Sequence, residues 1–545
     1  MFHSFFLTDN MWLKYLFHCG FNTDHRLSKF LLISFLDAQI IARSIKITKH
    51  LLVLNTKTSK SIYMMEEAAL EELTEFAANY AESLGAEYAE ARFQSDIQES
   101  IILKNGVPEA VVLEEERGIS VRVLVNGSLG FASTNRLTKE DVKSSVLEAY
   151  KMARAATKVL RKRISMDESE LGAATIEVKP HIDFESIDVE SKMELLREAY
   201  KQAVEEADNK KVKIPSCILT LDTWKAEKLI ITSDGAHIRS FTPRAALHTL
   251  ITAFHPQKGT VQRFFNLGGT GGWEIVEKWD LLRLFKEETQ TLSEILLFAK
   301  ERPSGKTDVI LGPEVVGLVC HESSGHPSEA DRILGREAAQ AGETFLKADS
   351  LGLRVGSPLV NVVDDPTLEG SFGFYLYDDE GVKARKRILI KEGVINEFLH
   401  NRETASIFKL KSNGSARAVA FNREPIIRMA NTYLEPGDYS KEELLEDIKD
   451  GVYIKTFMEW NIDDRRFNQR YVGLEAYRIE KGELKERIRN PILEVTTPRL
   501  WSSVDAVGKD LDFQAAYCGK GDPMQGIPVW TGGPHIRLRN VTLGG

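Results

Sequence analysis

Two Asn-Gly pairs constrain the fold of the first part of the chain, because each lies between runs in which apolar and polar residues alternate. Asn105-Gly106 and Asn126-Gly127 are typical of tight hairpin turns, since both residue types adopt positive φ at low cost. Alternation with a period of two is the pattern of a strand with one buried face. The sequence therefore predicts antiparallel sheet, with strands over residues 88–93, 100–103, 110–113 and 119–125.

Apolar residues recur at helical spacing in several other segments. Thr138 and Asp141 resemble a capping box at the start of one of them. We expect helices over residues 66–84, 140–156, 189–207 and 277–300. Further strands are expected over 218–222, 228–233, 237–241, 246–254 and 261–265, and the glycine-rich residues 268–272 are expected to form a flexible loop.

The length of 545 residues exceeds what one hydrophobic core usually serves, so we expect more than one domain. The segment 302–305 resembles a linker, which predicts an N-terminal domain over 65–302 and a C-terminal domain over 307–545. The expected fold class is α/β (α+β). Helices pack on antiparallel sheet in the first domain, and the second domain is rich in strands, expected at 308–311, 360–364, 388–390, 394–399 and 470–479.

Residues 1–64 differ from the rest in composition, because Lys and Arg outnumber Asp and Glu there. The apolar stretch 30–45 is interrupted by Asp37 and Arg43 and is too short for the ~20 apolar residues of a membrane span. It also lacks the features of a secretory signal. We expect residues 1–64 to be an extension outside the working fold, with translation beginning at Met64 or Met65, and we expect no membrane association.

The formal net charge of -9, without long runs of one sign, argues against a nucleic-acid-binding surface. The cysteines Cys19, Cys217, Cys320 and Cys518 lie far apart and form no CxxC pair. A reducing compartment suits this arrangement, so we expect a cytoplasmic protein.

The segment His321-Glu322-Ser323-Ser324-Gly325-His326 carries the strongest chemical signal. Neutral histidine nitrogen is a good zinc ligand, and a catalytic zinc site has three protein ligands and one place for water. Zinc lowers the pKa of that water toward ~7, and a neighbouring carboxylate can take its proton. We therefore predict His321 and His326 as zinc ligands and Glu322 as the general base. The plainer alternative is a helix end with two solvated histidines and a surface glutamate.

The spacing of the two histidines excludes a regular helix through both, because five residues at ~100° each turn their side chains ~140° apart. Gly325 frees the backbone, and Pro327 disfavours the α conformation at the residue before it. We predict a bulged turn that returns His326 toward His321.

Glu322 also continues an apolar stripe formed by Val315, Leu318 and Val319 at helical spacing. The carboxylate would then face the core, where it needs a partner. A water at the metal and a scissile amide would provide one.

The chain resembles the TldD/PmbA-type metallopeptidases, in the TldD-like branch, from about Met65 to its C-terminus. The resemblance rests on the HExxxH motif and several further segments in order: Glu329-Ala330-Asp331, 268–274, 379–381 with 399–402, 414–418, 428–432, Cys518-Gly519-Lys520 and 525–528. One departure is Pro327-Ser328 in place of a glycine-leucine pair of bacterial members.

This resemblance implies that Cys518 is the third zinc ligand and that the activity is cleavage of peptides or unfolded protein fragments. It also implies a dimer, formed either by two copies or with a PmbA-like chain that lacks the metal motif. A thiolate is a good zinc ligand, and Lys520 near Cys518 would lower the pKa of the thiol. Cys320 is the rival ligand, although it is adjacent to His321 and would point ~100° away on a helix.

Other residues leave alternatives open. Arg417 and Arg428 could bind a carboxylate or a carbonyl oxygen of the substrate, or could form surface ion pairs. His400 and His535 are left out of the metal site, because a lone histidine is more often structural or solvated. The sequence also leaves two other functions open: a non-catalytic zinc-containing partner subunit, and a metal-free modulator of another enzyme.

Overall fold

The computed structural model describes residues 56–160, 162–337 and 342–544. The chain divides into two compact units, Met1–Ala69 and Leu70–Gly545. Most of the expected extension lies outside the described residues, and the predicted first helix, α3 (Thr56–Ser83), begins earlier than expected. No helix within the described residues has the length and apolar character needed to cross a membrane. All sheets of the described residues belong to the second unit.

A seven-stranded sheet forms the first half of this unit, in the order β3-β2-β1-β5-β6-β4 with β7 also paired to β6. The predicted turn at Asn105-Gly106 is confirmed, with φ of 53° and 76°. The strands expected on either side are confirmed, but the expected interruptions are wrong, because 88–93 and 100–103 belong to one continuous strand, as do 110–113 and 119–125. Residues 268–270 end a strand and do not form the expected loop. The strands are β1 (Tyr88–Lys104), β2 (Val107–Val125), β3 (Ser128–Thr134), β4 (Ala173–Glu177), β5 (Lys213–Thr232), β6 (His237–His255) and β7 (Gly259–Thr270).

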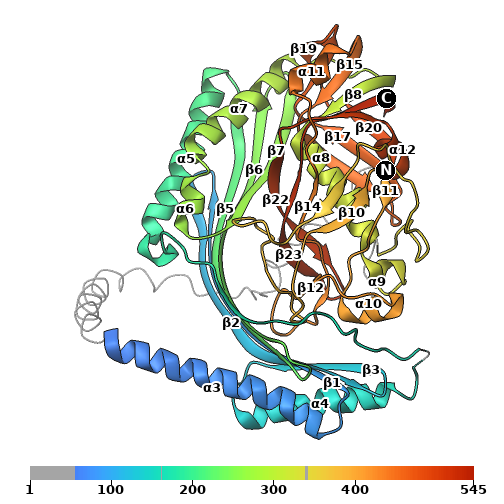
Figure 1. Cartoon of the computed structure of the whole chain (residues 1–545). Helices are drawn as coiled ribbons and strands as arrows, with labels where there is room; N and C mark the ends of the chain where they lie inside the picture. The colour runs from blue at the N-terminus through green and yellow to red at the C-terminus, as the bar shows by residue number, and fades with distance from the viewer. Residues whose placement is uncertain (1–55, 161, 338–341, 545) are drawn as a thin grey trace, which may run out of the picture. The chain divides into compact units, whose positions relative to one another are not determined.

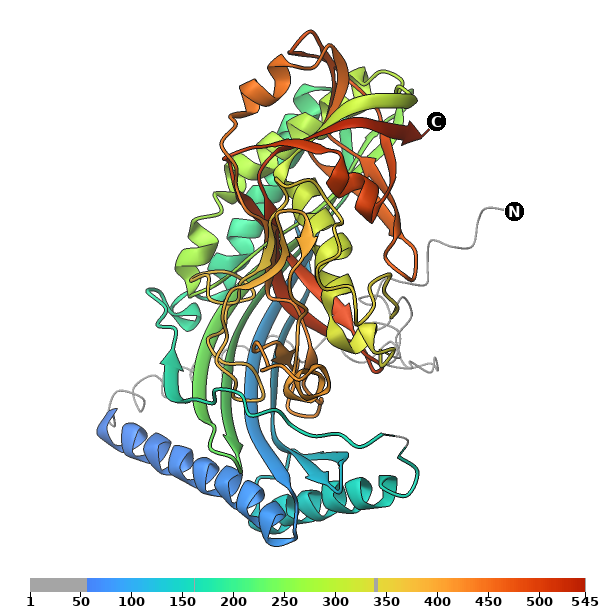
Figure 2. The ribbon, with the colours of Figure 1, turned by 45° about the vertical axis from the view of Figure 1, so that its right-hand side comes forward.

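One face of this sheet is covered by helices at both ends of its long strands. Ala89, Ala91 and Phe93 of β1 pack against α3 and α4 (Lys139–Ala156), whereas Ile101 and Leu103 pack near α5 (Val189–Asn209) and α7 (Leu281–Phe298). These five residues have odd numbers, so they share a face. Figures 1 and 2 show the long strands running between the two groups of helices. The predicted packing of helices on antiparallel sheet is confirmed.

The opposite face of the sheet carries buried charges that bind the second half of the unit. Arg122 lies 2.6 Å from Glu90 on the neighbouring strand and 2.6 Å from Glu380. Asp379 pairs with Arg92 at 3.3 Å and with Lys228 at 2.8 Å. Buried charges need such partners. The segment 379–381 therefore joins the first sheet to the later part of the chain.

Two larger sheets and one small one form the second half. The six-stranded sheet has the order β11-β10-β9-β14-β23-β22, and the nine-stranded sheet has the order β16-β17-β20-β24-β8-β15-β18-β19 with β21 on β24. The division into domains at 302–307 stays a prediction. The strands are β8 (Gly305–Leu311), β9 (Val362–Asp364), β10 (Arg387–Lys391), β11 (Val394–Ile395), β12 (Ala416–Arg417), β13 (Ile426–Ile427), β14 (Asn431–Leu434), β15 (Asp450–Ile454), β16 (Phe457–Ile462), β17 (Asn468–Gly473), β18 (Ala476–Glu480), β19 (Glu483–Arg487), β20 (Ile492–Thr496), β21 (Val504–Val507), β22 (Asp512–Lys520), β23 (Gln525–Gly533) and β24 (Ile536–Gly544).

Helix α8 (Pro313–Cys320) lies in the core shared by the two larger sheets. Its residues from Glu314 to Cys320 are all buried, as expected for a helix that is apolar on every side. It packs against β23, β14 and β22. The remaining helical segments are η2 (Phe184–Ser186), α6 (Trp273–Glu277), η3 (His321–Gly325), η4 (His326–Ser328), α9 (Ala330–Ile333), α10 (Arg402–Phe408), α11 (Lys441–Glu446) and α12 (Thr497–Ser502).

The turn that follows α8 is wider than an α-helical turn, as predicted. The backbone N–H of His326 donates to the carbonyl oxygen of His321, which is the five-residue bond of a π-helix. The expected cause was wrong. Gly325 has φ -64° and His326 has φ -56°, so both keep right-handed helical backbone despite Pro327. Gly325 is needed for space instead, because a Cβ atom there would overlap Sδ of Met429.

The contact between Gly325 and Met429 gives the first prediction. Gly325→Ala lowers the free energy of unfolding by ~1–3 kcal/mol, because the added methyl group overpacks this site. In a Met429→Ala background the same substitution has almost no further effect, since the obstructing sulfur is gone. Denaturant unfolding of the two single variants and the double variant measures both quantities. Equal costs of Gly325→Ala in the two backgrounds would contradict the steric explanation.

Candidate metal centre

Three of the predicted site residues lie together in the interior. His321, His326 and Cys518 each offer one donor atom, and these atoms all lie within 4.8 Å of one another. The two imidazole rings have centroids 4.8 Å apart, and Sγ of Cys518 lies 3.5 Å from Nε2 of His326. All three residues are buried, with 3–6% of their surface exposed. The wide turn thus brings together two side chains that a regular helix would separate.

Cys518 reaches this cluster from β22, which pairs with β23 at the edge of the six-stranded sheet. The guanidinium group of Arg428 donates to the carbonyl oxygens of Cys518 and Gln525 and so fixes the backbone at this point. Burial alone would raise the pKa of the Cys518 thiol. The interactions with His326, Arg428 and His321 outweigh burial and hold this pKa well below its usual range. The thiolate form, which binds metal, is thereby favoured.

The donor set fits zinc. Two imidazoles and one thiolate are common zinc ligands, and three protein ligands leave one position for water. Nδ1 of His321 is buried and has no hydrogen-bond partner, which is costly for a polar atom unless something else binds it. In contrast, Nδ1 of His326 lies 2.9 Å from Oε2 of Glu329, so Nε2 is the atom directed at Cys518.

Glu322 is buried beside the cluster, as its place on the apolar stripe predicted, with 8% of its surface exposed. Its carboxylate forms an ion pair with Arg466, which lies in the turn between β16 and β17 and has φ 59°. Burial would raise the pKa of Glu322, but Arg466, His326 and His321 outweigh it and lower this pKa. Sequence reasoning missed Arg466, because it lies 144 residues away and no motif marks it.

Glu329 is the second residue whose part in the site was missed. It is fully buried and contacts His326, Arg332 and Lys520. Burial would raise its pKa, but Lys520, His326 and Arg332 outweigh burial and hold this pKa well below its usual range. The three-residue spacing from His326 was the available signal, since such spacing brings side chains together on a helical turn.

Among the described residues, the other candidates do not belong to the donor cluster. Arg417 donates to the carbonyl oxygens of Met429 and Pro528 at 2.7 and 3.1 Å. Both guanidinium groups, of Arg417 and of Arg428, donate to backbone carbonyl oxygens. Contacts of these two residues with a substrate stay a prediction. Cys320 packs in the core, where burial raises the pKa of its thiol. Among the described residues, Cys320 is not part of the donor cluster.

The two histidines that were left out of the metal site have separate environments. Burial lowers the pKa of His400 to about 4, and its Nδ1 lies 3.1 Å from Oγ1 of Thr404. Nε2 of His535 lies 2.8 Å from the hydroxyl oxygen of Tyr453. Its Nδ1 binds Asp510. Neither histidine belongs to the cluster.

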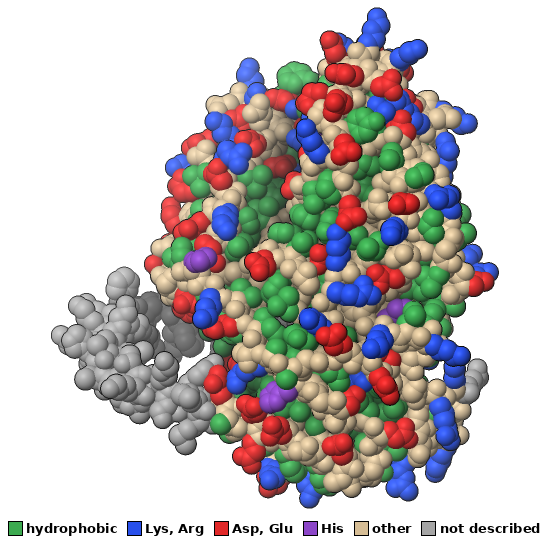
Figure 3. Space-filling model, viewed as in Figure 1, with side chains coloured by type: hydrophobic (Ala, Val, Ile, Leu, Met, Phe, Trp, Pro, Cys, Tyr) green, Lys and Arg blue, Asp and Glu red, His purple; other side chains and the backbone are tan. Residues whose placement is uncertain are grey.

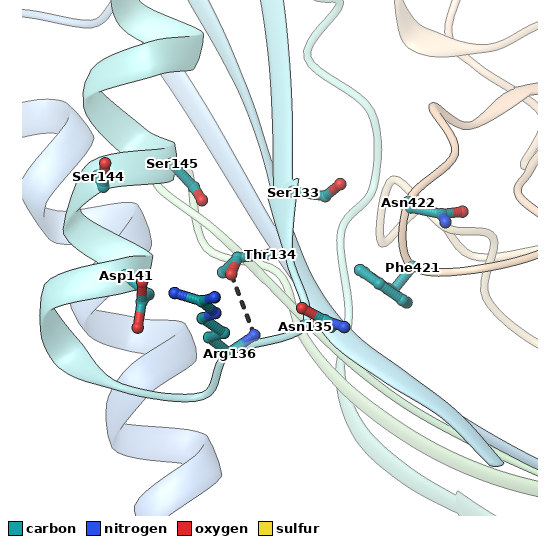
Figure 4. A pocket seen from close by; sticks show the side chains of 9 residues that line it. All are labelled: Ser133, Thr134, Asn135, Arg136, Asp141, Ser144, Ser145, Phe421 and Asn422. Atoms are coloured by element: carbon teal, nitrogen blue, oxygen red, sulfur yellow. Dashed lines mark hydrogen bonds between the residues drawn. The ribbon is translucent and has the colours of Figure 1, made fainter.

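A pocket of about 430 Å³ lies elsewhere, between the end of β3, the start of α4 and residues 421–422 (Figure 4). The backbone N–H of Arg136 donates to Oγ1 of Thr134 at its edge, over 3.1 Å. The pocket shares no residue with the cluster and holds no histidine or cysteine, so it lacks the nitrogen and sulfur donors of the proposed zinc site. Its lining is Ser133, Thr134, Asn135, Arg136, Asp141, Ser144, Ser145, Phe421 and Asn422.

On the face drawn in Figure 3, Lys and Arg side chains are interspersed with Asp and Glu. This mixture matches the absence of long single-sign runs in the sequence. No broad basic area of the kind that binds nucleic acid is visible on this face.

Solved structures share this fold. A Thermotoga maritima protein described as a candidate modulator of a DNA gyrase matches with a TM-score of 0.68 and 20% identity, over 87% of this chain and 100% of its own. TldE from Thermococcus kodakarensis matches with a TM-score of 0.63 and 18% identity, over 88% of this chain and 100% of its own.

Sequence comparison identifies the family. Models of the PmbA/TldA metallopeptidase domain 1, central domain and C-terminal domain match residues 89–153, 182–301 and 304–545. A metalloprotease of Methanocaldococcus jannaschii is 33% identical over 83% of this chain and 96% of its own. A zinc metalloprotease TldD homolog of Saccharolobus solfataricus is 27% identical over 85% of this chain and 98% of its own. The chain belongs to the PmbA/TldD metallopeptidase family.

Proposed function

We propose that this chain is a zinc-dependent peptidase. The observation that carries the proposal is the buried meeting of His321, His326 and Cys518, with the carboxylate of Glu322 beside them. Structural zinc sites are closed by four protein ligands. Among the described residues only three such donors gather here, which favours a site with one position open for reaction.

Each residue has a distinct part in this proposal. His321, His326 and Cys518 would hold zinc through two nitrogens and one sulfur. Zinc supplies Lewis acidity, which lowers the pKa of water and polarises a carbonyl group. Glu322 accepts a proton from the attacking water and delivers it to the nitrogen of the leaving amine as the C–N bond breaks. Arg466 keeps Glu322 ionised and fixes its orientation through their ion pair.

The names of the relatives support this reading. The similar proteins of Methanocaldococcus jannaschii and Saccharolobus solfataricus are called a metalloprotease and a zinc metalloprotease. We extend the proposal to peptides or unfolded protein fragments as substrates and to action in the cytoplasm. We also propose a dimer, formed by two copies or with a PmbA-like chain, because TldE shares the fold.

One observation favours a second candidate, a non-catalytic zinc-containing partner subunit. The carboxylate of Glu322 is engaged by Arg466, and a base held in this way is less available to a water molecule. The zinc ligands would then serve structure alone. This candidate predicts zinc binding without cleavage.

Glu322→Gln separates the two candidates, because it keeps the shape of the side chain and removes the base. We expect cleavage of a short peptide to fall ~10²–10⁴-fold, the usual contribution of a general base. Zinc content is expected to stay equal to that of wild type. Peptide cleavage and metal analysis on the same preparations measure both.

The matched control is Glu314→Gln on α8. Glu314 is also a buried carboxylate paired with an arginine, Arg263 at 2.8 Å, but it is not one of the donors. This variant is expected to cleave at the wild-type rate. Unchanged cleavage by Glu322→Gln would remove the proposed base. A wild-type protein that binds zinc and cleaves no peptide would favour the second candidate.

Cys518→Ser tests the third ligand. A serine hydroxyl is a poor zinc ligand, so we expect zinc content after exhaustive dialysis to fall to a small fraction of the wild-type value. Cys320→Ala is expected to retain zinc, because the Cys320 thiol lies outside the cluster. If Cys320→Ala lost zinc and Cys518→Ser retained it, Cys320 and not Cys518 would be the third ligand.

A further inference from the structure

Glu329 lies where the chain leaves the wide turn. It follows η4 and has extended backbone, with φ -70° and ψ 115°. Its side chain turns back toward the preceding histidine, and Oε2 lies 2.9 Å from Nδ1 of His326. None of its surface is exposed. A carboxylate in this position has to be held by other groups, because water does not reach it.

The contact decides which nitrogen of His326 is free. A carboxylate accepts a hydrogen bond from the ring, so the proton of the neutral imidazole lies on Nδ1 and the lone pair on Nε2. Nε2 is the atom that lies 3.5 Å from Sγ of Cys518. Glu329 therefore directs the binding nitrogen of His326 toward the other donors.

Two buried cations hold Glu329. Nε of Arg332 lies 2.5 Å from Oε2, and Nζ of Lys520 lies 3.3 Å from Oε1. Lys520 also lies 2.7 Å from Asp331 and donates to the carbonyl oxygen of Ile427 at 2.8 Å. Both cations are almost fully buried. The carboxylate of Glu329 thus contacts two cations, Arg332 and Lys520. Its third contact is the ring of His326.

Strand β22 carries both Lys520, which contacts Glu329, and the thiol ligand Cys518. Cys518 and Lys520 are two residues apart on one strand, so their side chains lie on the same face. One face of β22 therefore presents both the sulfur donor and the cation that holds the carboxylate behind His326.

We propose that Glu329 is a positioning residue of the metal centre: held by Arg332 and Lys520, it orients His326 so that Nε2 meets zinc together with Cys518. This inference rests on the proposed function only in taking zinc as the ion. Carboxylates behind a ligating histidine typically change metal affinity ~10–100-fold when they are replaced.

The test measures zinc affinity by competition with a chelator of known affinity, on the full chain. We expect Glu329→Ala to weaken zinc binding ~10–100-fold. Glu329→Gln, which keeps the volume and one acceptor oxygen, is expected to weaken it less than Glu329→Ala. The d–d absorption bands of the cobalt-substituted protein are expected to shift in both variants, and more in Glu329→Ala, because no side chain then accepts from the ring of His326.

Glu314→Gln again serves as control, since it also breaks a buried ion pair with an arginine and contacts no donor. A merely structural role of Glu329 predicts that all three variants lower the melting temperature while zinc affinity and the cobalt spectrum stay at wild-type values. Affinity within two-fold of wild type in Glu329→Gln would overturn the proposal even if Glu329→Ala failed to fold. A wild-type protein that binds no zinc would instead refute the proposed function.

Discussion

The whole centre depends on one backbone hydrogen bond, from the N–H of His326 to the carbonyl oxygen of His321. A regular helix would point the two rings ~140° apart, and the wider π turn brings them back to one side. An isolated turn of this kind is uncommon, so its surroundings have to favour it. Met429 packs on the bare Cα of Gly325, and the hydroxyl of Ser328 donates to the carbonyl oxygen of Ser324 at 2.7 Å.

Burial determines what else the centre needs. Helix α8 is enclosed on all sides, so the turn at its end begins in an environment that water does not screen. In such surroundings each charge requires a partner close by. Glu322 has Arg466, and Glu329 has Arg332 and Lys520. The site therefore requires both the donors and the ion pairs that stabilise the charged side chains around them.

Local sequence patterns predicted the features that local energetics determine. The turn at Asn105-Gly106 and the side-chain cap of α4 by Thr138 follow from the preferences of a few adjacent residues. The same reasoning failed in the long strands. Residues 94–99 were expected to lie outside the strands, but Ser95 and Glu99 pair with β2 and β5 like their apolar neighbours. Pairing across the sheet overrides local preference there.

The site was predictable only where its residues are close in sequence. His321, Glu322 and His326 form a motif, and the spacing of the histidines alone required a non-regular turn. Cys518 was assigned through family resemblance, because no spacing rule connects residues 192 positions apart. Arg466 was missed for the same reason, since its contact with Glu322 exists only after the sheets have assembled. Lys520 was expected to act on the Cys518 thiol, and its contact with Glu329 was missed.

The glycine-rich segment connects the first sheet to the strand that carries a metal ligand. A Cβ atom at Gly268 would lie 3.1 Å from Cβ of Ala515 on β22, so the missing side chain lets β7 approach that strand closely. The indole N–H of Trp530 donates to the carbonyl oxygen of Gly268 at 2.8 Å and joins the first sheet to β23. Because β22 carries both Cys518 and Lys520, the approach of the first sheet supports the strand that supplies the thiol and the cation behind His326. Gly268 therefore supports the site through packing.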